Sequence, residues 1–143
     1  MLNQFVTIRG VVTVGNEFCS PSHIQDNTGA IAVYGTITSD SINIGDDVVL
    51  TGKVTNFNGL TELVELTLNQ IVSQGNTVEP VLVTTQEINE SYEEMLVKIL
   101  GVVVRDTFGN PITTWDCGTS GRNYRLIDAS GFTQIREIGR AHV

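Results

Sequence analysis

Alternation of hydrophobic and polar residues runs through the first half of the chain. From Val6 to Val14 every second residue is Val, Ile or Gly. A period of two is typical of a β-strand with one face against a core. Gly10 lies in the middle of this stretch, where glycine usually marks a bend. We therefore expect Phe5–Val14 to be one long strand that curls around two sides of a small barrel.

Four further segments are bounded by residues that favour turns. Asp26-Asn27-Thr28-Gly29 and Asn56-Phe57-Asn58-Gly59 predict hairpin turns, because Asp and Asn side chains bond their own backbone and glycine adopts positive φ. The expected strands of this set are Phe5–Val14, Ser22–Gln25, Ala30–Tyr34, Val48–Val54 and Leu60–Ser73. Together they indicate an all-β domain of five strands over residues 1–75.

The next segment, residues 76–95, is predicted to be a linker that ends in a short helix. Thr84 or Thr85 would cap this helix, and the apolar residues after them recur at helical spacing up to Met95. Strands are expected again at Leu96–Val104, Asn123–Ile127 and Phe132–Arg136, with a long loop over Phe108–Gly121 and a turn at Asp128–Gly131.

An internal repeat relates the two halves of the chain. Thr7–Val12 aligns with Lys98–Val103, and Ile24–Gly29 aligns with Leu126–Gly131. The order and the turn chemistry agree, which implies tandem domains. The second copy lacks counterparts of the last two strands, so residues 96–136 are predicted to be a truncated repeat.

The last residues, 137–143, follow a polar strand without a turn or cap. Residues 138–143 match a translation of a common sequencing-adapter DNA, ATC GGA AGA GCA CAC GTC. We expect the natural sequence to depart from this chain near Arg136 or Glu137. Arg140 and His142 therefore receive no functional weight.

Four segments of the sequence resemble a known family. They are Val6–Thr13, Ser22–Asp26, Gly45–Gly52 and Asn56–Leu63. They are similar to the OB-like tandem repeats of large secreted bacterial proteins. Some of those repeats accompany extracellular nuclease, phosphoesterase or lamin-tail-type domains, and others belong to surface lipoproteins. The resemblance implies a five-stranded OB-type Greek-key barrel, a secreted or cell-surface location, and a parent protein whose neighbouring domains are partners. It supplies no catalytic residues.

Charge and cysteine content narrow the function classes. Sixteen acidic residues face eight basic ones, for a formal net charge of −8. Because surfaces that bind nucleic acid are normally basic, this balance disfavours nucleic-acid binding without excluding a local basic patch. The tandem strand pattern and the resemblance favour a non-catalytic accessory or spacer module. Cys19 and Cys117 lie in different repeats and lack zinc-ligand spacing, and whether they are free or bonded stays open. No segment is apolar enough to span a membrane, and there is no signal peptide.

Catalytic and metal-binding motifs are not expected. The sequence contains no nucleophile elbow, phosphate loop or His-rich metal motif. Asp46 with Asp47, or Asp26 with Asn27, are oxygen donors of the kind that calcium uses, but turns alone account for these pairs. We therefore predict no catalytic residue, no metal and no cofactor.

Candidate ligand residues follow from the way OB-folds bind. The face of the second and third strands and the adjoining loops holds single-stranded nucleic acid or oligosaccharide, with aromatic rings for stacking. In the first repeat these positions include Phe18, His23, Tyr34 and Phe57. The second repeat has more Arg and the Trp: Arg105, Phe108, Trp115, Arg122, Tyr124 and Arg125. Three alternatives stay open: aromatics that only cover the barrel, a nucleic-acid surface serving an extracellular nuclease, or a polysaccharide surface.

Overall fold

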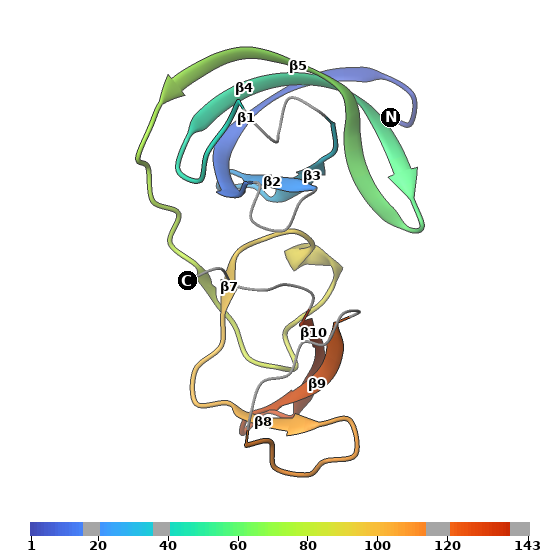
Figure 1. The fold of residues 1–143 in the computed structure, drawn as a ribbon, viewed down its shortest axis with the longest axis vertical. Coiled ribbons are helices and arrows are strands. Elements are labelled where there is room, and N and C mark those ends of the chain that lie inside the picture. Colours follow the sequence, from blue (N-terminus) through green and yellow to red (C-terminus); the bar gives the residue numbers. More distant parts are fainter. Residues whose placement is uncertain (16–20, 36–40, 114–120, 138–143) are drawn as a thin grey trace. The chain divides into compact units, whose positions relative to one another are not determined.

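A computed structural model describes residues 1–15, 21–35, 41–113 and 121–137 (Figure 1). The chain divides into two compact units. Unit 1 comprises Met1–Pro80 and Tyr92–Leu96, and unit 2 comprises Val81–Ser91 and Val97–Val143. Both are built from β-strands, which confirms the predicted all-β class. Within the described ranges, no helix is long and apolar enough to cross a membrane.

Unit 1 is a closed barrel of five strands, drawn blue to green in Figure 1. The strands are β1 (Phe5–Val14), β2 (Ser22–Gln25), β3 (Ala30–Val33), β4 (Asp47–Phe57) and β5 (Leu60–Ser73). Their order around the barrel is β1-β2-β3-β5-β4, and β1 closes the ring by pairing with β4. β3 and β5 run parallel, whereas the other neighbours are antiparallel. All five predicted strands are present, with ends that differ by a few residues.

The bend in β1 lies where the sequence predicts it. Phe5–Val11 pair with β4, and pairing with β2 begins only at Val11. At Gly10 a Cβ atom would lie 2.7 Å from the carbonyl oxygen of Gln25. Glycine is needed here because the backbone of β2 approaches too closely for any side chain.

The barrel interior is a single cluster of aliphatic side chains. Its buried members are Val12, Ile24, Val33, Ile42, Val48, Leu50, Val54 and Leu63, and Val6, Ile8, Ile31, Leu66 and Leu68 pack against them. The inward-facing set predicted for β1 is confirmed at Val6, Ile8 and Val12. A core of this size lets unit 1 bury a continuous apolar surface.

Unit 2 has two small sheets. The first is a parallel pair formed by β6 (Val81–Leu82) and β7 (Val97–Lys98). The second is an antiparallel sheet in the order β10-β9-β8. Its strands are β8 (Val103–Asp106), β9 (Arg122–Ile127) and β10 (Phe132–Glu137). The strand predicted over Leu96–Val104 is thus two strands, interrupted near Gly101, whose φ is +66°.

The predicted helix over Thr84–Met95 is wrong. Within residues 84–95 the structure has only a single 3-10 turn, η1 (Glu90–Tyr92). Glu87 Oε2 accepts hydrogen bonds from both N (2.7 Å) and Oγ1 (2.8 Å) of Thr84, but no α-helix follows within residues 85–95 for Thr84 to cap. Asn89 then competes with a helix: its side chain donates to the carbonyl of Glu87 (2.7 Å) and accepts from Ser91 N (2.8 Å). Such side-chain bonds satisfy the backbone in a turn and remove the reason to continue a helix.

The β2–β3 and β9–β10 hairpins have the same geometry. Each strand pair closes at the residue before an Asp, so Gln25 pairs with Ala30 and Ile127 pairs with Phe132. Across each turn the Asp N donates to the Gly carbonyl, at 2.9 Å for Asp26 and 3.0 Å for Asp128. In this geometry Asp26 of the first turn matches Asp128 of the second, and Gly29 matches Gly131.

Candidate nucleic-acid interface

One face of the β8-β9-β10 sheet collects most of the arginines of unit 2. Because side chains alternate along a strand, the register places a set of residues from all three strands on one side. This set is Val103, Arg105, Asn123, Arg125, Ile127, Phe132, Gln134 and Arg136, and we call it the arginine face. Arg105 pairs directly with Arg125, and Arg125 pairs with Gln134 on its other side.

The opposite face of this sheet points inward. Tyr124 is only 4% exposed there, with Leu126 and Ile135 half-buried beside it in the alternation. Tyr124 was predicted to stack on a ligand, and its burial corrects that prediction. Arg122 alternates with Tyr124, so it belongs to this side of the strand rather than to the arginine face.

An aromatic ring completes the arginine face. Phe132 is 61% exposed, and the guanidinium of Arg125 lies 5.2 Å from the centre of its ring. A cation above an aromatic ring is attracted to its π-face and holds the ring in place. Phe132 and Arg136 were not among the ligand residues predicted from the sequence. Strict alternation from the turn, Phe132, Gln134, Arg136, was the signal that places them with Arg125.

The arginine face carries two guanidinium groups from directly paired residues, Arg105 and Arg125. Neither Arg105 nor Arg125 forms an ion pair with a carboxylate in the described part of the chain. Arg136 donates from Nη1 to Asn123 Oδ1 (3.3 Å), which holds its guanidinium along the sheet. Two arginines in directly opposed positions repel each other, and an anion between them would relieve that repulsion.

The turn after β8 presents Phe108 to solvent. The carboxylate of Asp106 accepts hydrogen bonds from the backbone N of Phe108 (2.9 Å) and of Asn110 (2.7 Å). Hydrogen bonds from Asn110, its side chain first, lower the pKa of Asp106, so the turn is held by an ionised carboxylate. Phe108 is 89% exposed.

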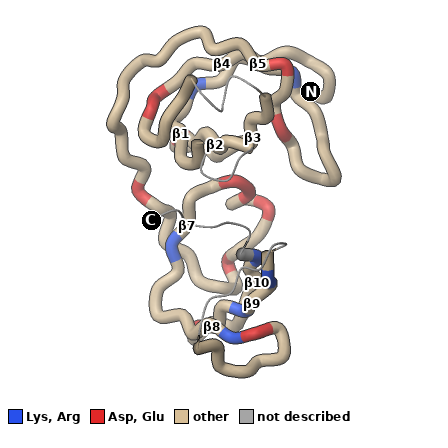
Figure 2. Tube along the Cα trace, in the orientation of Figure 1, with Lys and Arg blue, Asp and Glu red and all other residues tan. Residues whose placement is uncertain are grey.

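Charge is distributed unequally between the units. Unit 1 contains ten acidic residues and two basic ones, Arg9 and Lys53, whereas unit 2 has six of each. The blue segments in Figure 2 accordingly gather on β8, β9 and β10. The net charge of the chain, −8, therefore describes unit 1 and not unit 2.

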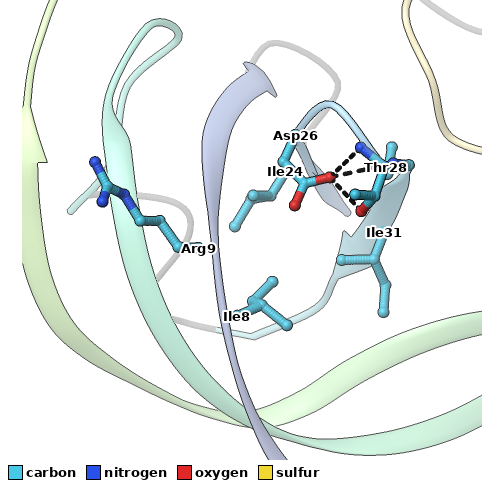
Figure 3. A pocket seen from close by; sticks show the side chains of 8 residues that line it. Ile8, Arg9, Ile24, Asp26, Thr28 and Ile31 are labelled. Atoms are coloured by element: carbon cyan, nitrogen blue, oxygen red, sulfur yellow. Dashed lines mark hydrogen bonds between the residues drawn. The ribbon is translucent and has the colours of Figure 1, made fainter.

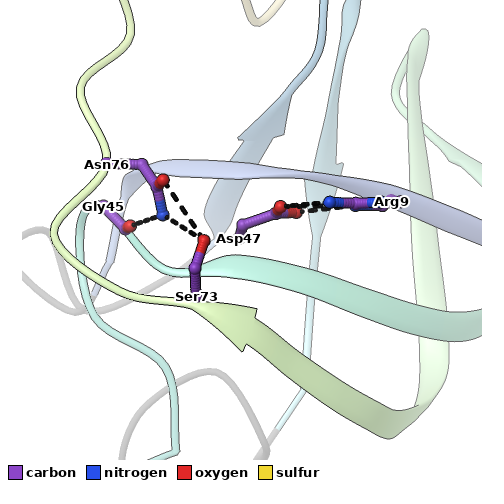
Figure 4. A network of polar contacts seen from close by, with 5 residues as sticks. All are labelled: Arg9, Gly45, Asp47, Ser73 and Asn76. Atoms are coloured by element: carbon purple, nitrogen blue, oxygen red, sulfur yellow. Dashed lines mark hydrogen bonds and ion pairs between the residues drawn. The ribbon is translucent and has the colours of Figure 1, made fainter.

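Both cations of unit 1 are already paired. Arg9 donates to Asp47 from Nε (3.1 Å) and from Nη2 (2.7 Å) (Figure 4). Lys53 Nζ lies 3.1 Å from Glu65 Oε1. The side-chain hydrogen bond between Arg9 and Asp47 raises the pKa of Arg9 and lowers the pKa of Asp47. Asn76 closes the adjoining turn by donating to the carbonyl of Gly45 (2.8 Å). These contacts stabilise the barrel end and leave no spare cation for phosphate.

The carboxylate of Asp46 holds the same turn. This buried carboxylate accepts from Asn43 N (2.9 Å) and from Gln74 Nε2 (3.1 Å). Among the described residues, no group of three or more His, Cys, Asp or Glu side chains is placed to hold a metal ion.

Residues 92–96 cover the side of β2 that carries His23 and Gln25. His23 Nδ1 is paired with Glu94 Oε2, and Gln25 Oε1 accepts a hydrogen bond from Leu96 N (2.7 Å). Gln25 is only 4% exposed because residues 92–96 lie against this side of β2. Tyr34 and Phe57 are exposed. Phe18 and Trp115, with Cys19 and Cys117, lie outside the described residues.

Comparison with known proteins finds a relative with significant sequence similarity to this chain. Endonuclease YhcR of Bacillus subtilis (strain 168) is 32% identical over 115 residues, which are 71% of this chain and 9% of that protein. The chain thus spans less than a tenth of the relative's length. No family model matches the sequence, and no solved structure matches it. The chain is similar to a short part of an endonuclease.

Proposed function

We propose that this chain is a non-catalytic accessory module of a secreted or cell-surface protein, and that unit 2 binds single-stranded nucleic acid through the arginine face. The neighbouring domains of the parent protein would carry out any hydrolysis. The similarity to a short part of an endonuclease supports a nucleic-acid ligand more than the overall acidity opposes it. The acidity resides in unit 1, so it does not weaken the field of the arginine face.

The fold proposal is a pair of OB-type repeats, the second one partial. The barrel order β1-β2-β3-β5-β4 is the order in which OB-type Greek-key strands meet. The shared register and turn bonds of the β2–β3 and β9–β10 hairpins support a repeat. The β8–β9 pairing differs by one residue from the aligned β1–β2 pairing, which follows from the interruption of the strand near Gly101.

The observation that carries the binding proposal is the row of Arg105 and Arg125 beside the exposed ring of Phe132. Single strands bind to grooves that combine phosphate-neutralising cations with rings on which bases stack. The arginine face supplies both on one side of a rigid sheet. In an OB-type fold this side corresponds to the ligand-binding face of the second and third strands.

Titration of the whole chain with a fluorescent single-stranded oligonucleotide tests the proposal. We expect affinity to fall as salt rises, with a log–log slope of about −0.7 for each phosphate neutralised. Phe132→Ala should weaken binding roughly 5- to 100-fold by removing a stacking surface. Arg125→Gln should weaken binding and also make the salt slope shallower. Phe57→Ala, an exposed aromatic of unit 1, and Lys53→Gln are matched controls and should change neither quantity.

Three results would count against this proposal. No binding at low salt, or binding unaffected by both Phe132→Ala and Arg125→Gln, excludes the arginine face. Aromatic dependence without salt dependence indicates an uncharged oligosaccharide instead. Hydrolase activity of the purified chain that a single substitution abolishes would overturn the non-catalytic role.

A further inference from the structure

A small cleft opens beside the β2–β3 turn of unit 1 (Figure 3). Its volume is about 220 Å³, and its walls include the aliphatic side chains of Ile8, Ile24 and Ile31 with Asp26 and Gly29 at the turn. Arg9 also borders the cleft, but its guanidinium points away in Figure 3 and binds Asp47. The cleft therefore combines an apolar wall with one carboxylate.

The matching turn of unit 2 is covered by residues 84–86. Asp128 Oδ2 accepts a hydrogen bond from Thr85 N (2.8 Å), and Asp128 Oδ1 accepts one from Thr85 Oγ1 (2.8 Å). Gln86 N donates to Ser130 Oγ (3.3 Å). Thr85 is 2% exposed, whereas Thr84 and Gln86 on either side of it are exposed, so the segment lies on the surface with the Thr85 side chain buried at the turn.

The covering segment approaches this turn in an extended form. Val81–Leu82 pair in parallel with Val97–Lys98, and Val83 N donates to the carbonyl of Lys98 (3.0 Å). Val83 is buried, and Thr85 follows it two positions later. The turn is therefore recognised by an extended peptide in which Val83 is buried and Thr85, two positions later, binds the carboxylate of Asp128.

Unit 1 has the same receptor groups, and they are unoccupied by any described residue. Oδ1 of Asp26 accepts from Thr28 N (2.7 Å), Thr28 Oγ1 (2.6 Å) and Gly29 N (3.1 Å), as Oδ1 of Asp128 does from Ser130 and Gly131. Oδ2 of Asp26 accepts no hydrogen bond from a described residue, whereas Oδ2 of Asp128 binds Thr85.

The two glycines at these turns show the same difference. A Cβ atom on Gly131 would lie 2.8 Å from Nε2 of Gln86, whereas a Cβ atom on Gly29 would meet nothing within 4 Å. The strand pairing of β1 also leaves space near this turn. Among the described residues, Phe5–Gly10 pair only with β4, and pairing with β2 begins at Val11. One edge of β1 over Phe5–Gly10 therefore has no strand partner among the described residues and is available to pair with an extended peptide.

We propose that the cleft of unit 1 binds an extended interdomain linker peptide of the kind formed by residues 81–86, with an apolar side chain against Ile8, Ile24 and Ile31 and a Thr at Asp26. The peptide comes from a neighbouring domain of the parent protein. This site goes beyond the proposed nucleic-acid binding and shares no residue with the arginine face. Failure of one proposal therefore leaves the other standing.

A synthetic peptide with the sequence of residues 80–87, PVLVTTQE, is the probe. We expect it to shift the NMR signals of Ile8, Ile24 and Ile31 in the full chain, with saturation at millimolar concentration or below. Residues 81–86 stay in place in unit 2, because a segment of the same chain has a far higher effective concentration than the added peptide. A peptide carrying Thr85→Val lacks the hydroxyl and should bind more weakly.

Two substitutions in the chain make the test specific. Gly29→Ala fills space that is empty in unit 1, so folding should be unchanged while peptide binding is lost. Asp26→Asn keeps an oxygen for the turn but replaces the free acceptor with a donor, and should weaken binding roughly tenfold or more. Asn27→Ala, in the same turn but outside the cleft lining, is the control and should bind normally.

The outcomes separate cleanly. No shift of the cleft residues at peptide concentrations of about 5 mM, beyond the weakest specific affinities, overturns the proposal. Equal binding by the original chain and Gly29→Ala also overturns it. The same shifts on raising protein concentration without peptide would identify a second copy as the occupant and refute a linker from a neighbouring domain.

Discussion

The β2–β3 hairpin of unit 1 and the β9–β10 hairpin of unit 2 share their register and turn but differ in what covers them. In unit 1 residues 92–96 occupy the side of β2 that carries His23 and Gln25, and the turn at Asp26 is open. In unit 2 the matching side carries Arg125, which is half-buried and has no ion pair with a described carboxylate, while residues 84–86 cover the turn. One backbone motif therefore presents two different surfaces, because neighbouring segments decide which one solvent and ligands reach.

The packing of the two units differs as well, and this contrast predicts the largest effect. Leu50 is fully buried in a closed barrel, so Leu50→Ala should lower the free energy of unfolding of unit 1 by about 2–5 kcal/mol. Leu126 is only half-buried in a three-stranded sheet, and Leu126→Ala should cost unit 2 about 1–2 kcal/mol. Urea unfolding followed by unit-specific NMR signals measures both.

Limited proteolysis of the unsubstituted chain provides a check on the same contrast. We expect residues 96–136 to be degraded before residues 4–75, since an open sheet exposes strand edges and apolar side chains. Earlier loss of the first segment would contradict this order.

The paired glycines predict the next largest effect. At Gly131 a Cβ atom would lie 2.8 Å from Nε2 of Gln86, and because Gln86 is a flexible and exposed side chain, Gly131→Ala should displace that side chain and destabilise unit 2 by about 1 kcal/mol. Gly29→Ala should leave unit 1 within about 0.5 kcal/mol, because its Cβ atom enters open space. Equal losses from the two substitutions would show that the covering contact has no energetic weight.

The turn carboxylates predict a difference in acid sensitivity. Hydrogen bonds from Ser130, then from Thr85, lower the pKa of Asp128, and bonds from Thr28 lower the pKa of Asp26. A lowered folded-state pKa stabilises the fold at pH values above the unfolded pKa of about 3.9, and this stabilisation is lost as pH falls through the folded-state pKa.

Asp128→Asn should therefore flatten the acid limb of the stability profile of unit 2 below about pH 4. Asp26→Asn should have a smaller effect on unit 1, because Asp26 lacks the two extra bonds that Thr85 gives Asp128. Chemical denaturation at several pH values measures both limbs. An unchanged profile for Asp128→Asn would show that hydrogen bonds to the ionised Asp128 carboxylate do not stabilise unit 2.

The smallest stability effects are expected at surface cations. Lys53 pairs with Glu65 on the barrel surface, and such pairs contribute about 0–1 kcal/mol, so Lys53→Gln should barely change unfolding. Arg125→Gln should also be nearly neutral for stability, yet it should reduce oligonucleotide affinity. Thermal unfolding run beside the binding titration separates the two properties, and loss of affinity that tracked loss of stability would point to misfolding.

Local chemistry explains where sequence-based prediction was accurate. The Asn56–Gly59 turn forms as expected, because the Asn56 side chain bonds both N and O of Gly59 while Asn58 and Gly59 take positive φ. The Asp-centred turns and the inward alternation of β1 depend equally on neighbouring residues. The helix over residues 84–95 was predicted from local spacing too, but bonds from Asn89 within the segment and from Thr85 to Asp128 outweighed that pattern.

The candidate site was only partly predictable. Arg105, Arg125 and Phe108 were predicted from the sequence, and in the structure Phe108 is exposed while the two arginines are half-buried. Tyr124 was misassigned, since alternation defines two faces of β9 without saying which one faces inward. His23 was also expected to reach ligand, but its partner Glu94 lies 71 residues further along the chain.

Residue order alone was therefore enough to establish the β class, the turns and the strand positions, because these depend on contacts within a few residues. Which hairpin face is exposed, and which turn is open, depends on segments 92–96 and 84–86. Those segments meet their hairpins through long-range hydrogen bonds to Gln25 and Asp128. No local pattern encodes such pairings, because their partners become neighbours only after each unit has folded.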